Sequence, residues 1–280
     1  MGSQTKGKLN SLQQTLPEGL VVDAGWLERQ GVSRQLRRKY VMHGWLQTLA
    51  RGVFCRPRVP DEQSTVPWQQ LLISLNALEN VPAAAGARTA LDLQGFSHYV
   101  SLTGSREAHL YSNGALPGWV SRVPVDTKLV LHNARRLFRN RDVPAFFTPG
   151  TAAPKPPEDS GFIQQQGPWK YPLTLSAPER AILELLDEVP KRETFHQADA
   201  LMEGLRNLSP RRLQGLLADC KSVKVKRLFF WFAERHNHAW LPKIDRSAID
   251  LGKGKRMLVR GGKLDRKYNI TVPEKMDAGV

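Results

Sequence analysis

Residues 31–56, GVSRQLRRKYVMHGWLQTLARGVFCR, decide how the N-terminal part of this chain folds. Gly31 supplies a break, and Ser33 belongs to the residue types that cap helix N-termini. Gly44 belongs to the type that ends helices. The spacing therefore predicts a helix from Ser33 to His43.

A short hairpin is expected directly after this helix. Residues 45–49 and 53–56 have strand-forming composition, and the tight turn Ala50-Arg51-Gly52 joins them. A hairpin in this place is the wing of a winged helix. Arg51 would then stand at its tip, where it can enter a minor groove or grip the DNA backbone.

Two further helices are expected before this segment. Leucines spaced by three and four residues predict a helix over 6–16, and Asp23 can cap a second helix that runs to Gln30. The order of helix, helix, turn, helix and hairpin predicts a winged helix-turn-helix DNA-binding domain over residues 1–58.

The third expected helix has two different faces. Leu36 and Tyr40, four residues apart, can pack inward with Val32, whereas another face carries arginines at positions i, i+3 and i+4. A recognition helix reaches base edges and phosphates in the major groove from such a face. The alternative is a solvated face without a partner. The candidate DNA-binding residues here are Arg34, Arg37 and Arg38, flanked by Ser33, Gln35 and Lys39.

Several apolar residues of this domain are expected in its core rather than in contact with DNA. Cys55, next to the second wing strand, is interpreted as a small buried hydrophobic residue. The expected core residues are Trp26, Leu27, Trp45 and Leu46.

The charge of the chain is concentrated at two places. The 280 residues contain 41 Lys and Arg against 26 Asp and Glu, a net charge of +15. Residues 1–60 carry +7 and residues 221–270 carry +10, whereas residues 61–220 and 271–280 carry −1 each. Such a surplus favours a polyanionic partner and says nothing about the fold.

Several classes of protein are excluded by composition. Cys55 and Cys220 lie far apart, without the paired spacing of a structural zinc site or a disulfide framework. No stretch approaches the roughly 18 apolar residues of a membrane helix, and the polar N-terminus does not resemble a signal peptide. We expect a cytoplasmic protein that has no membrane partner, no metal and no cofactor.

Proline and glycine divide the remaining chain. RPRVPDEQSTVP at 56–67 is typical of a linker, and 149–172 forms a second break. We expect a middle region over 67–148, packed with a C-terminal unit over 172–280. An amphipathic helix is predicted over 68–78, a second apolar segment lies over 88–95, and a strand is predicted over 123–131.

The C-terminal unit is expected to begin with a capped helix. Ser176 would be the N-cap and Glu179 the third residue of a capping box, with Pro178 in the first turn. Further helices are predicted over 195–206 and 209–219. The pattern over 223–232 is ambiguous between strand and helix, and 257–259 and 268–272 are predicted as strands joined by a Gly261-Gly262 turn. The fold class is α+β, a winged helix-turn-helix followed by a larger mixed α/β unit.

The basic C-terminal segment is a possible second binding surface. GKGKR lacks the GxxxxGK[ST] spacing of a nucleotide-binding loop, which excludes nucleotide hydrolysis. Three functional interpretations stay open: a second contact to the DNA backbone, a surface that binds a partner protein, or a surface for a tRNA-like RNA. The structural alternative is a basic surface for solubility or internal pairing. The surface comprises Lys224, Lys226, Lys253, Lys255, Arg256, Arg260 and Lys263.

A metal-dependent endonuclease is the alternative function. Asp250, followed by Asp265-Arg266-Lys267, loosely matches an arrangement in which two carboxylates hold magnesium and a lysine supports the attacking water. The match is weak, because such short patterns recur by chance.

Several phrases resemble a known family. GVSRQLRRKYVMHGWLQTLARGVF resembles the N-terminal winged helix of AbiEi-type antitoxins, transcriptional regulators of type IV toxin-antitoxin systems. SAPERAILELLDEVP, LSPRRLQGLLADCKSVKVKRLFFWFAE and IDLGKGKRMLVRGGKLDRKYNITVP resemble the C-terminal antitoxin domain.

The resemblance implies a function without catalysis. The winged helix of such proteins binds inverted repeats in the promoter of its own operon and represses it. The C-terminal domain neutralises a nucleotidyltransferase-like toxin, either by direct contact or indirectly. The resemblance assigns the contacts to double-stranded DNA to Ser33, Arg34, Gln35, Arg37, Arg38 and Arg51.

Overall fold

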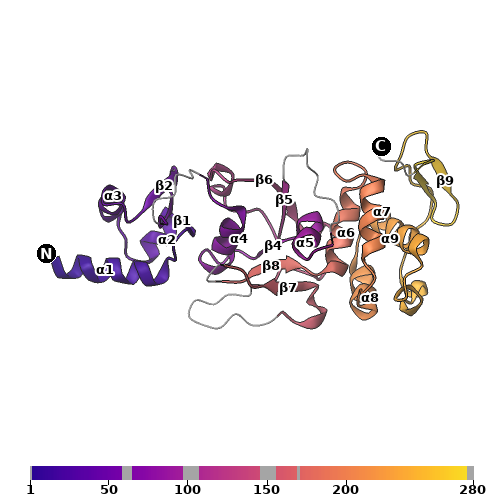
Figure 1. Ribbon diagram of the computed structural model, residues 1–280, viewed down its shortest axis with the longest axis horizontal. Coiled ribbons are helices and arrows are strands. Elements are labelled where there is room, and N and C mark those ends of the chain that lie inside the picture. Colours follow the sequence, from indigo (N-terminus) through magenta and orange to yellow (C-terminus); the bar gives the residue numbers. More distant parts are fainter. Residues whose placement is uncertain (1, 59–64, 97–106, 146–155, 169–170, 276–280) are drawn as a thin grey trace.

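The chain forms three parts in a row, as the ribbon of the computed structural model shows (Figure 1). The structure describes residues 2–58, 65–96, 107–145, 156–168 and 171–275. The N-terminal helices with a small sheet lie at one end, a larger sheet lies in the middle, and the C-terminal helices lie at the other end. The architecture is α+β, as predicted.

The first part is the predicted helix-turn-helix with a wing. Asp23 caps the second helix through the N–H of Trp26, and Ser33 caps the third through the N–H of Leu36. Gly31 and Gly44 follow the second and third helices with φ of 76° and 71°, which glycine adopts without steric cost. The elements are α1 (Gly2–Thr15), β1 (Val21–Asp23), α2 (Ala24–Arg29), α3 (Arg34–Met42), β2 (Gln47–Ala50) and β3 (Val53–Cys55).

A small antiparallel sheet completes this part, with β3 between β1 and β2. Trp26, Leu27 and Leu46 are buried in its core, as predicted, and so is Cys55. The prediction for Trp45 is wrong. Its side chain follows the turn at Gly44, leans edge-on against Tyr40 and leaves 40% of the residue exposed.

The next helix, α4 (Trp68–Ala77), lies between the small sheet and the large one. The sequence predicted an amphipathic helix, but α4 is buried at nearly every position, because the winged helix covers one side and the body covers the other. Val21, Val53 and Cys55 of the small sheet share one hydrophobic cluster with Leu71 and Leu75 of α4. The two parts thus have a common core.

The large sheet has five strands and combines segments from both sides of residues 149–155. Its order is β6-β5-β4-β8-β7, with parallel pairs at β5–β6 and β4–β8 and antiparallel pairs elsewhere. The strands are β4 (Ala83–Ala85), β5 (Glu107–Ser112), β6 (Lys128–Asn133), β7 (Phe162–Gln165) and β8 (Leu173–Ser176). The strand predicted over 123–131 begins only at Lys128; Val125 before it forms an isolated bridge with Val66.

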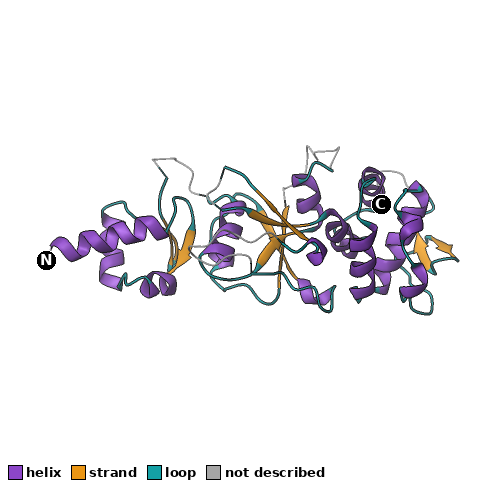
Figure 2. Ribbon diagram, turned by 90° about the horizontal axis from the view of Figure 1, so that it is seen from below, coloured by secondary structure: helices purple, strands orange, loops and turns teal. Residues whose placement is uncertain are grey.

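Helices α5 (Ala87–Leu93) and α6 (Pro178–Glu188) pack against each other beside this sheet. Figure 2 shows its strands in the middle of the molecule, with helices on both sides. The predicted capping box at α6 is wrong. Ser176 belongs to β8, and the N-cap is Ala177, which makes no side-chain cap bond. Glu179 instead accepts a hydrogen bond from the Ser209 N–H and pairs with Arg212, so it holds the start of a later helix.

The last part is mainly helical. The ambiguous pattern over 223–232 is a helix, because its turn of large aromatic residues at 229–232 packs among the neighbouring helices rather than against a strand partner. The elements are α7 (Phe195–Gly204), α8 (Pro210–Asp219), α9 (Val223–His236), β9 (Lys263–Asp265) and β10 (Ile270–Val272).

The predicted C-terminal hairpin is displaced along the sequence. Residues 257–259 form no strand, and Gly261-Gly262 is not the hairpin turn. β9 instead begins at Lys263 and pairs antiparallel with β10. The turn between them is closed by the Asp265 carboxylate, which accepts the Tyr268 N–H at 2.8 Å.

Among the described residues, none of the helices has both the length and the apolar character required to cross a bilayer.

A fully buried ion pair lies beside the sheet. Arg180 donates to Glu184 one turn later on α6 at 2.7 Å, and both side chains are inaccessible to solvent. The guanidinium lies between the rings of Phe138 and Phe162, and Glu184 also accepts the Ala87 N–H. The pair therefore connects α6 to the sheet, to α5 and to the segment after β6.

Arg180→Met should destabilise the protein by about 3 to 5 kcal/mol, because it leaves the Glu184 carboxylate buried without its countercharge. The free energy of unfolding in urea measures this effect. Arg180→Met combined with Glu184→Leu removes both charges and should recover part of the loss. A single variant as stable as the wild type would contradict the assigned role of the pair.

Two histidines form a second buried polar contact, on β5 and β6. Nδ1 of His109 lies 3.0 Å from Nε2 of His132. Burial lowers the pKa of each imidazole from 6.5 to about 4. The charged neighbours are Glu107, Lys128, Arg88, Glu188 and Arg192.

These pKa values make stability depend on pH. Between about pH 6.5 and 4 the unfolded chain binds protons that the folded chain does not, so the free energy of unfolding should fall as the pH falls through this window. We expect His109→Gln with His132→Gln to flatten this dependence in urea titrations at pH 7, 5.5 and 4.5. Parallel curves for variant and wild type would show that other groups cause the acid sensitivity.

Candidate nucleic-acid interface

Helix α3 presents a polar, basic surface to solvent. Arg34, Gln35, Arg38 and Lys39 are exposed, while Tyr40 on the opposite side is fully buried. The Ser33 hydroxyl is used as the cap of the helix. The exposed donors stand along about one and a half turns, an arrangement that fits base edges and phosphates of a major groove.

Arg37 does not belong to this surface, and the prediction that it projects with Arg34 and Arg38 is wrong. Its side chain is only 9% exposed and donates from Nη1 to the Glu28 carboxylate at 2.9 Å. The same nitrogen also lies within 3.3 Å of the carbonyls of Ala24 and Val32. Positions i and i+4 share a helix face more closely than i and i+3, so Arg34 and Arg38 stay outside while Arg37 turns toward α2.

The wing carries one further solvent-exposed basic residue, Arg51. Arg51 is exposed in the turn between β2 and β3, and Gly52 after it has a φ of 77°. The Gly52 carbonyl accepts the Ala24 N–H at 2.9 Å, which ties the wing to the start of α2. The wing therefore has a defined position relative to the helix-turn-helix.

Exposed apolar residues at the end of α3 were missed by the sequence analysis. Met42 is 79% exposed, and the His43 ring lies 5.2 Å from the Trp45 ring. Gly44 could have indicated this exposure, because a glycine allows the chain to turn before Trp45 and directs the indole ring away from the core. These side chains stand between α3 and the first wing strand.

The C-terminal basic surface is smaller than predicted. Lys253, Lys255, Arg256, Arg260 and Lys263 are exposed. Lys224 and Lys226 do not belong with them, because both lie on the buried first turns of α9. Lys226 is 4% exposed. The Lys224 ammonium donates to the Val189 carbonyl at 3.0 Å and lies 3.6 Å from Asp187, and burial lowers its pKa.

A buried arginine shapes the exposed loop at 251–256. Arg227 on α9 is 2% exposed, and its guanidinium donates to the carbonyls of Leu251, Gly252, Gly254 and Asn269 at 2.7 to 3.2 Å. The loop carbonyls point inward to this cation. The lysines of the loop therefore stand on its outer side.

Asp250 and Asp265, the two carboxylates of the nuclease hypothesis, each stabilise a turn of the backbone. Asp250 accepts the Gly252 N–H at 2.7 Å, and Asp265 accepts the Tyr268 N–H. Within the described ranges, no group of three or more His, Cys, Asp or Glu side chains is arranged to hold a metal ion.

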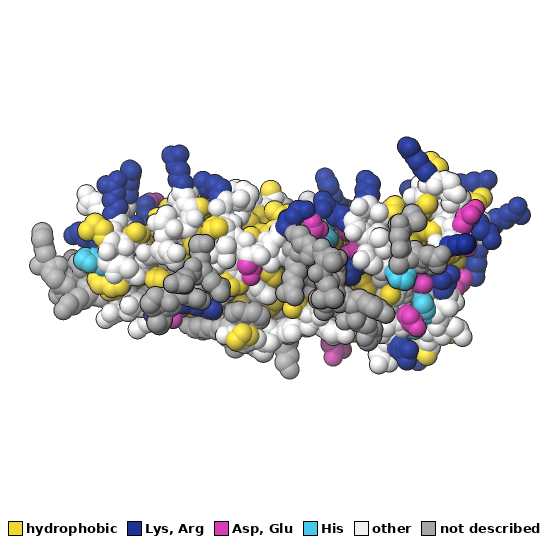
Figure 3. All heavy atoms as spheres, turned by 45° about the horizontal axis from the view of Figure 1, so that its top comes forward, with side chains coloured by type: hydrophobic (Ala, Val, Ile, Leu, Met, Phe, Trp, Pro, Cys, Tyr) yellow, Lys and Arg dark blue, Asp and Glu magenta, His cyan; other side chains and the backbone are white. Residues whose placement is uncertain are grey.

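Basic side chains recur along one side of the molecule. Figure 3 shows Lys and Arg side chains projecting over the N-terminal part, the centre and the C-terminal end of the face in view. Acidic side chains on this face are few and lie mainly toward the C-terminal half. The two basic segments that the sequence indicated are therefore accessible to solvent, although fewer of their basic residues are exposed than predicted.

The fold and this surface define a winged-helix protein with an appended α+β unit. One solved structure shows the same arrangement: the "RV2827C protein from Mycobacterium tuberculosis" superimposes with a TM-score of 0.52 over 96% of this chain and 91% of that chain. The identity is 14%, so this likeness concerns the fold. No functionally curated protein matches the sequence.

Two family profiles cover almost the whole chain. Residues 5–102 match "Transcriptional regulator, AbiEi antitoxin N-terminal domain", and residues 105–273 match "Transcriptional regulator, AbiEi antitoxin, Type IV TA system". The chain belongs to this family of AbiEi antitoxin transcriptional regulators, which confirms the resemblance. The first profile extends well beyond the winged helix and includes α4 and α5, in keeping with the core that α4 shares with the small sheet.

Arg37→Ala should lower the stability of the winged helix by about 1 to 2 kcal/mol, because it removes hydrogen bonds that join α3 to α2. Arg34→Ala, an exposed arginine on the same helix, is the matched control and should stay within about 0.5 kcal/mol of the wild type. Thermal or urea unfolding measures both. Equal stabilities for the two variants would show that Arg37 has no structural role.

Proposed function

We propose that this protein binds inverted repeats in the promoter of its own operon and represses it, and that its C-terminal unit neutralises a nucleotidyltransferase-like toxin. Membership in the family supports regulation and antitoxin activity in general. The operator, the toxin and the site of action in the cytoplasm are parts of the proposal. We propose no catalytic step.

One observation carries the DNA-binding part. Arg34, Gln35, Arg38 and Lys39 are exposed on a helix that is capped at its start and anchored by Tyr40, and Arg51 is exposed on the adjoining wing. A rigid helix with free guanidinium groups can enter the major groove, while the wing cation contacts a neighbouring phosphate. Ser33 contributes as the cap that orients the first turn.

The exposed C-terminal basic surface supports two roles within this function. Lys253, Lys255 and Arg256 on the loop held by Arg227 can contact backbone phosphates or an acidic face of the toxin. Co-purification of the toxin with this protein would support direct neutralisation. Rescue of growth without a stable complex would support the indirect route.

The endonuclease alternative receives no support from the geometry. The carboxylates of Asp250 and Asp265 each accept a backbone N–H of their own turn, so those oxygens are engaged in local structure. We therefore propose regulation without DNA cleavage, which incubation of supercoiled plasmid with the protein and magnesium tests directly.

Arg34→Ala and Arg38→Ala should each weaken binding to duplex DNA from upstream of the gene by about 1 to 3 kcal/mol and relax specificity at single positions. Arg51→Ala should weaken binding to all sequences, and the slope of log K against log salt should decrease by about one, since each phosphate contact contributes about 0.9. Fluorescence anisotropy over a salt series measures both effects.

The matched control is Arg122→Ala, which removes one exposed arginine from the body. It should leave affinity and salt slope near their wild-type values. Binding by the Arg34 and Arg38 variants at wild-type strength would refute the assignment of α3 to the major groove.

A further inference from the structure

We infer that Ser74 and Glu79 are positioning residues that hold the winged helix in one orientation on the body, and that this orientation sets the spacing between two half-sites that the protein accepts. The inference rests on the proposed binding to inverted repeats. These two residues do not belong to the DNA-reading surface, because their side chains are buried against the edge of β1.

The first contact satisfies an edge of the small sheet. β1 pairs with β3 on one side only, so the N–H groups on its other side need acceptors from outside the sheet. The Val21 N–H donates to the Ser74 hydroxyl of α4 at 2.8 Å, and both residues are fully buried. The hydroxyl in turn donates to the Gln70 carbonyl at 2.6 Å. α4 thus supplies a hydrogen-bond partner that the winged helix lacks.

The second contact reaches both ends of α2. The Glu79 carboxylate accepts the Asp23 N–H at 2.9 Å and pairs with the Arg29 guanidinium at 3.2 Å. The Glu79 side chain is 7% exposed. Glu79 follows the C-terminal end of α4, where its own N–H donates to the Ser74 carbonyl at 3.1 Å. Asp23 is the N-cap of α2 and Arg29 is its last residue, so one carboxylate fixes the axis of α2 relative to the end of α4.

The contact continues from α2 to the recognition helix. Arg37 of α3 donates to the Ala24 carbonyl and to the Glu28 carboxylate, both on α2. A chain of hydrogen bonds therefore connects α4 through α2 to α3. Any change in how Glu79 holds α2 changes the direction of the surface that carries Arg34 and Arg38.

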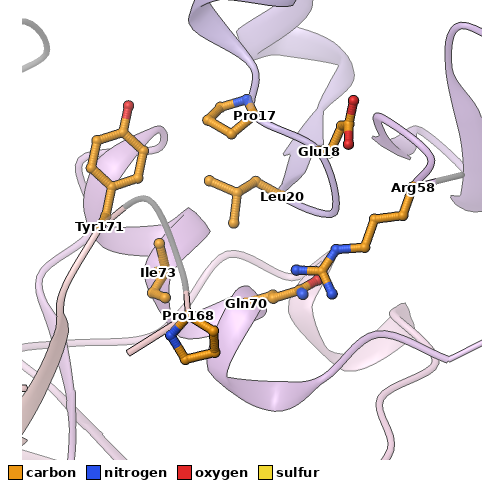
Figure 4. Close-up of a pocket in the computed structure, with 8 residues that line it drawn as sticks. All are labelled: Pro17, Glu18, Leu20, Arg58, Gln70, Ile73, Pro168 and Tyr171. Carbon is orange, nitrogen blue, oxygen red and sulfur yellow. The ribbon is translucent and has the colours of Figure 1, made fainter. Parts of the chain in front are cut away.

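Apolar side chains pack across this junction on both sides, and a pocket remains next to one of them. On one side, Val21 and Val53 share a cluster with Leu71 and Leu75. On the other side, Leu16, Leu20 and Val22 share a cluster with Leu72 and Ile73, beside a pocket of about 180 Å³ that Leu20, Ile73 and Tyr171 help to line (Figure 4). Apolar burial has no preferred direction, whereas hydrogen bonds do, so we assign the angle between the two parts to the contacts of Ser74 and Glu79.

A fixed orientation has a consequence for operator choice. Two copies on inverted half-sites place their recognition helices at a separation that the protein geometry dictates. A winged helix that can rotate relative to the body accepts several separations between half-sites. A winged helix held in one orientation by Ser74 and Glu79 accepts a single separation. The two residues then determine specificity without touching DNA.

The first test measures orientation directly in the full chain without DNA. Spin labels at exposed positions on α1 and α7, introduced by Gln14→Cys and Glu203→Cys, report the distance between winged helix and body by double electron–electron resonance. The two native cysteines are buried. We expect one narrow distance distribution for the wild type and a broad one for Ser74→Ala combined with Glu79→Ala. A distribution that stays narrow in the double variant would overturn the inference.

The second test measures spacing specificity. Affinity is compared for a single half-site, for the native operator, and for an operator with an insertion of about five base pairs, half a helical turn. The wild type should bind the native operator about tenfold or more tightly than the insertion, and the double variant should lose most of that ratio while keeping single-site affinity within about twofold. An unchanged ratio in the double variant would overturn the specificity role.

Two further variants separate orientation from folding. Glu79→Gln keeps an oxygen for the Asp23 N–H and should retain the narrow distribution, whereas Glu79→Ala should not. Ser121→Ala with Asp142→Ala removes an exposed hydroxyl and an exposed, ion-paired carboxylate from the body and should change neither readout. If no operator DNA binds to the wild type, the proposed function fails, while the distance measurement still decides the role of Ser74 and Glu79.

Discussion

The docking of the edge strand β1 against α4 is the constraint on which the arrangement of this molecule depends. A buried edge strand must find acceptors for its outward N–H groups, and here Ser74 and Glu79 supply them. The strand then carries α2, and α2 carries α3 through Arg37. The same helix, α4, also packs against β4 of the five-stranded sheet. One helix is therefore shared by the small domain and the large one, and neither can move without changing its contacts with α4.

Local signals were sufficient to predict the winged helix from the sequence. Asp23 and Ser33 cap their helices, and Gly31 and Gly44 follow them with positive φ, because each of these preferences depends on a few neighbouring residues. The expectation for α4 was less accurate. Its apolar residues were recognised, but its burial on both sides follows from two separate domains that meet there. Similarly, Ser176 has the residue type of a cap, yet it pairs with Phe162 in the sheet.

The sequence predicted that the candidate site is a basic surface on a helix and a wing, but it predicted only some of the residues that form this surface. Arg34, Arg38 and Arg51 were identified correctly as exposed cations. Arg37, Lys224 and Lys226 were also assigned to the surface, but Arg37 and Lys226 are buried and Lys224 is half-buried. The reason is the same for Arg37 and Lys224: a long cationic side chain bonds to backbone carbonyls of an element that is distant in sequence or turned away. Spacing along one helix does not reveal whether such carbonyls are within reach.

The net charge of +15 therefore overstates the charge that a polyanion meets, because several guanidinium groups organise the interior. Arg37 joins two helices, Arg180 pairs with Glu184 beside the sheet, and Arg227 bonds to four backbone carbonyls, three of them in the loop at 251–256. Planar guanidinium groups suit this role, since they offer five donors in fixed directions. The buried cations and the exposed ones are nevertheless connected. Arg37 fixes the helix on which Arg34 and Arg38 stand, and Arg227 shapes the loop that bears Lys253 and Lys255, so in each case a buried arginine determines where the outer charges lie.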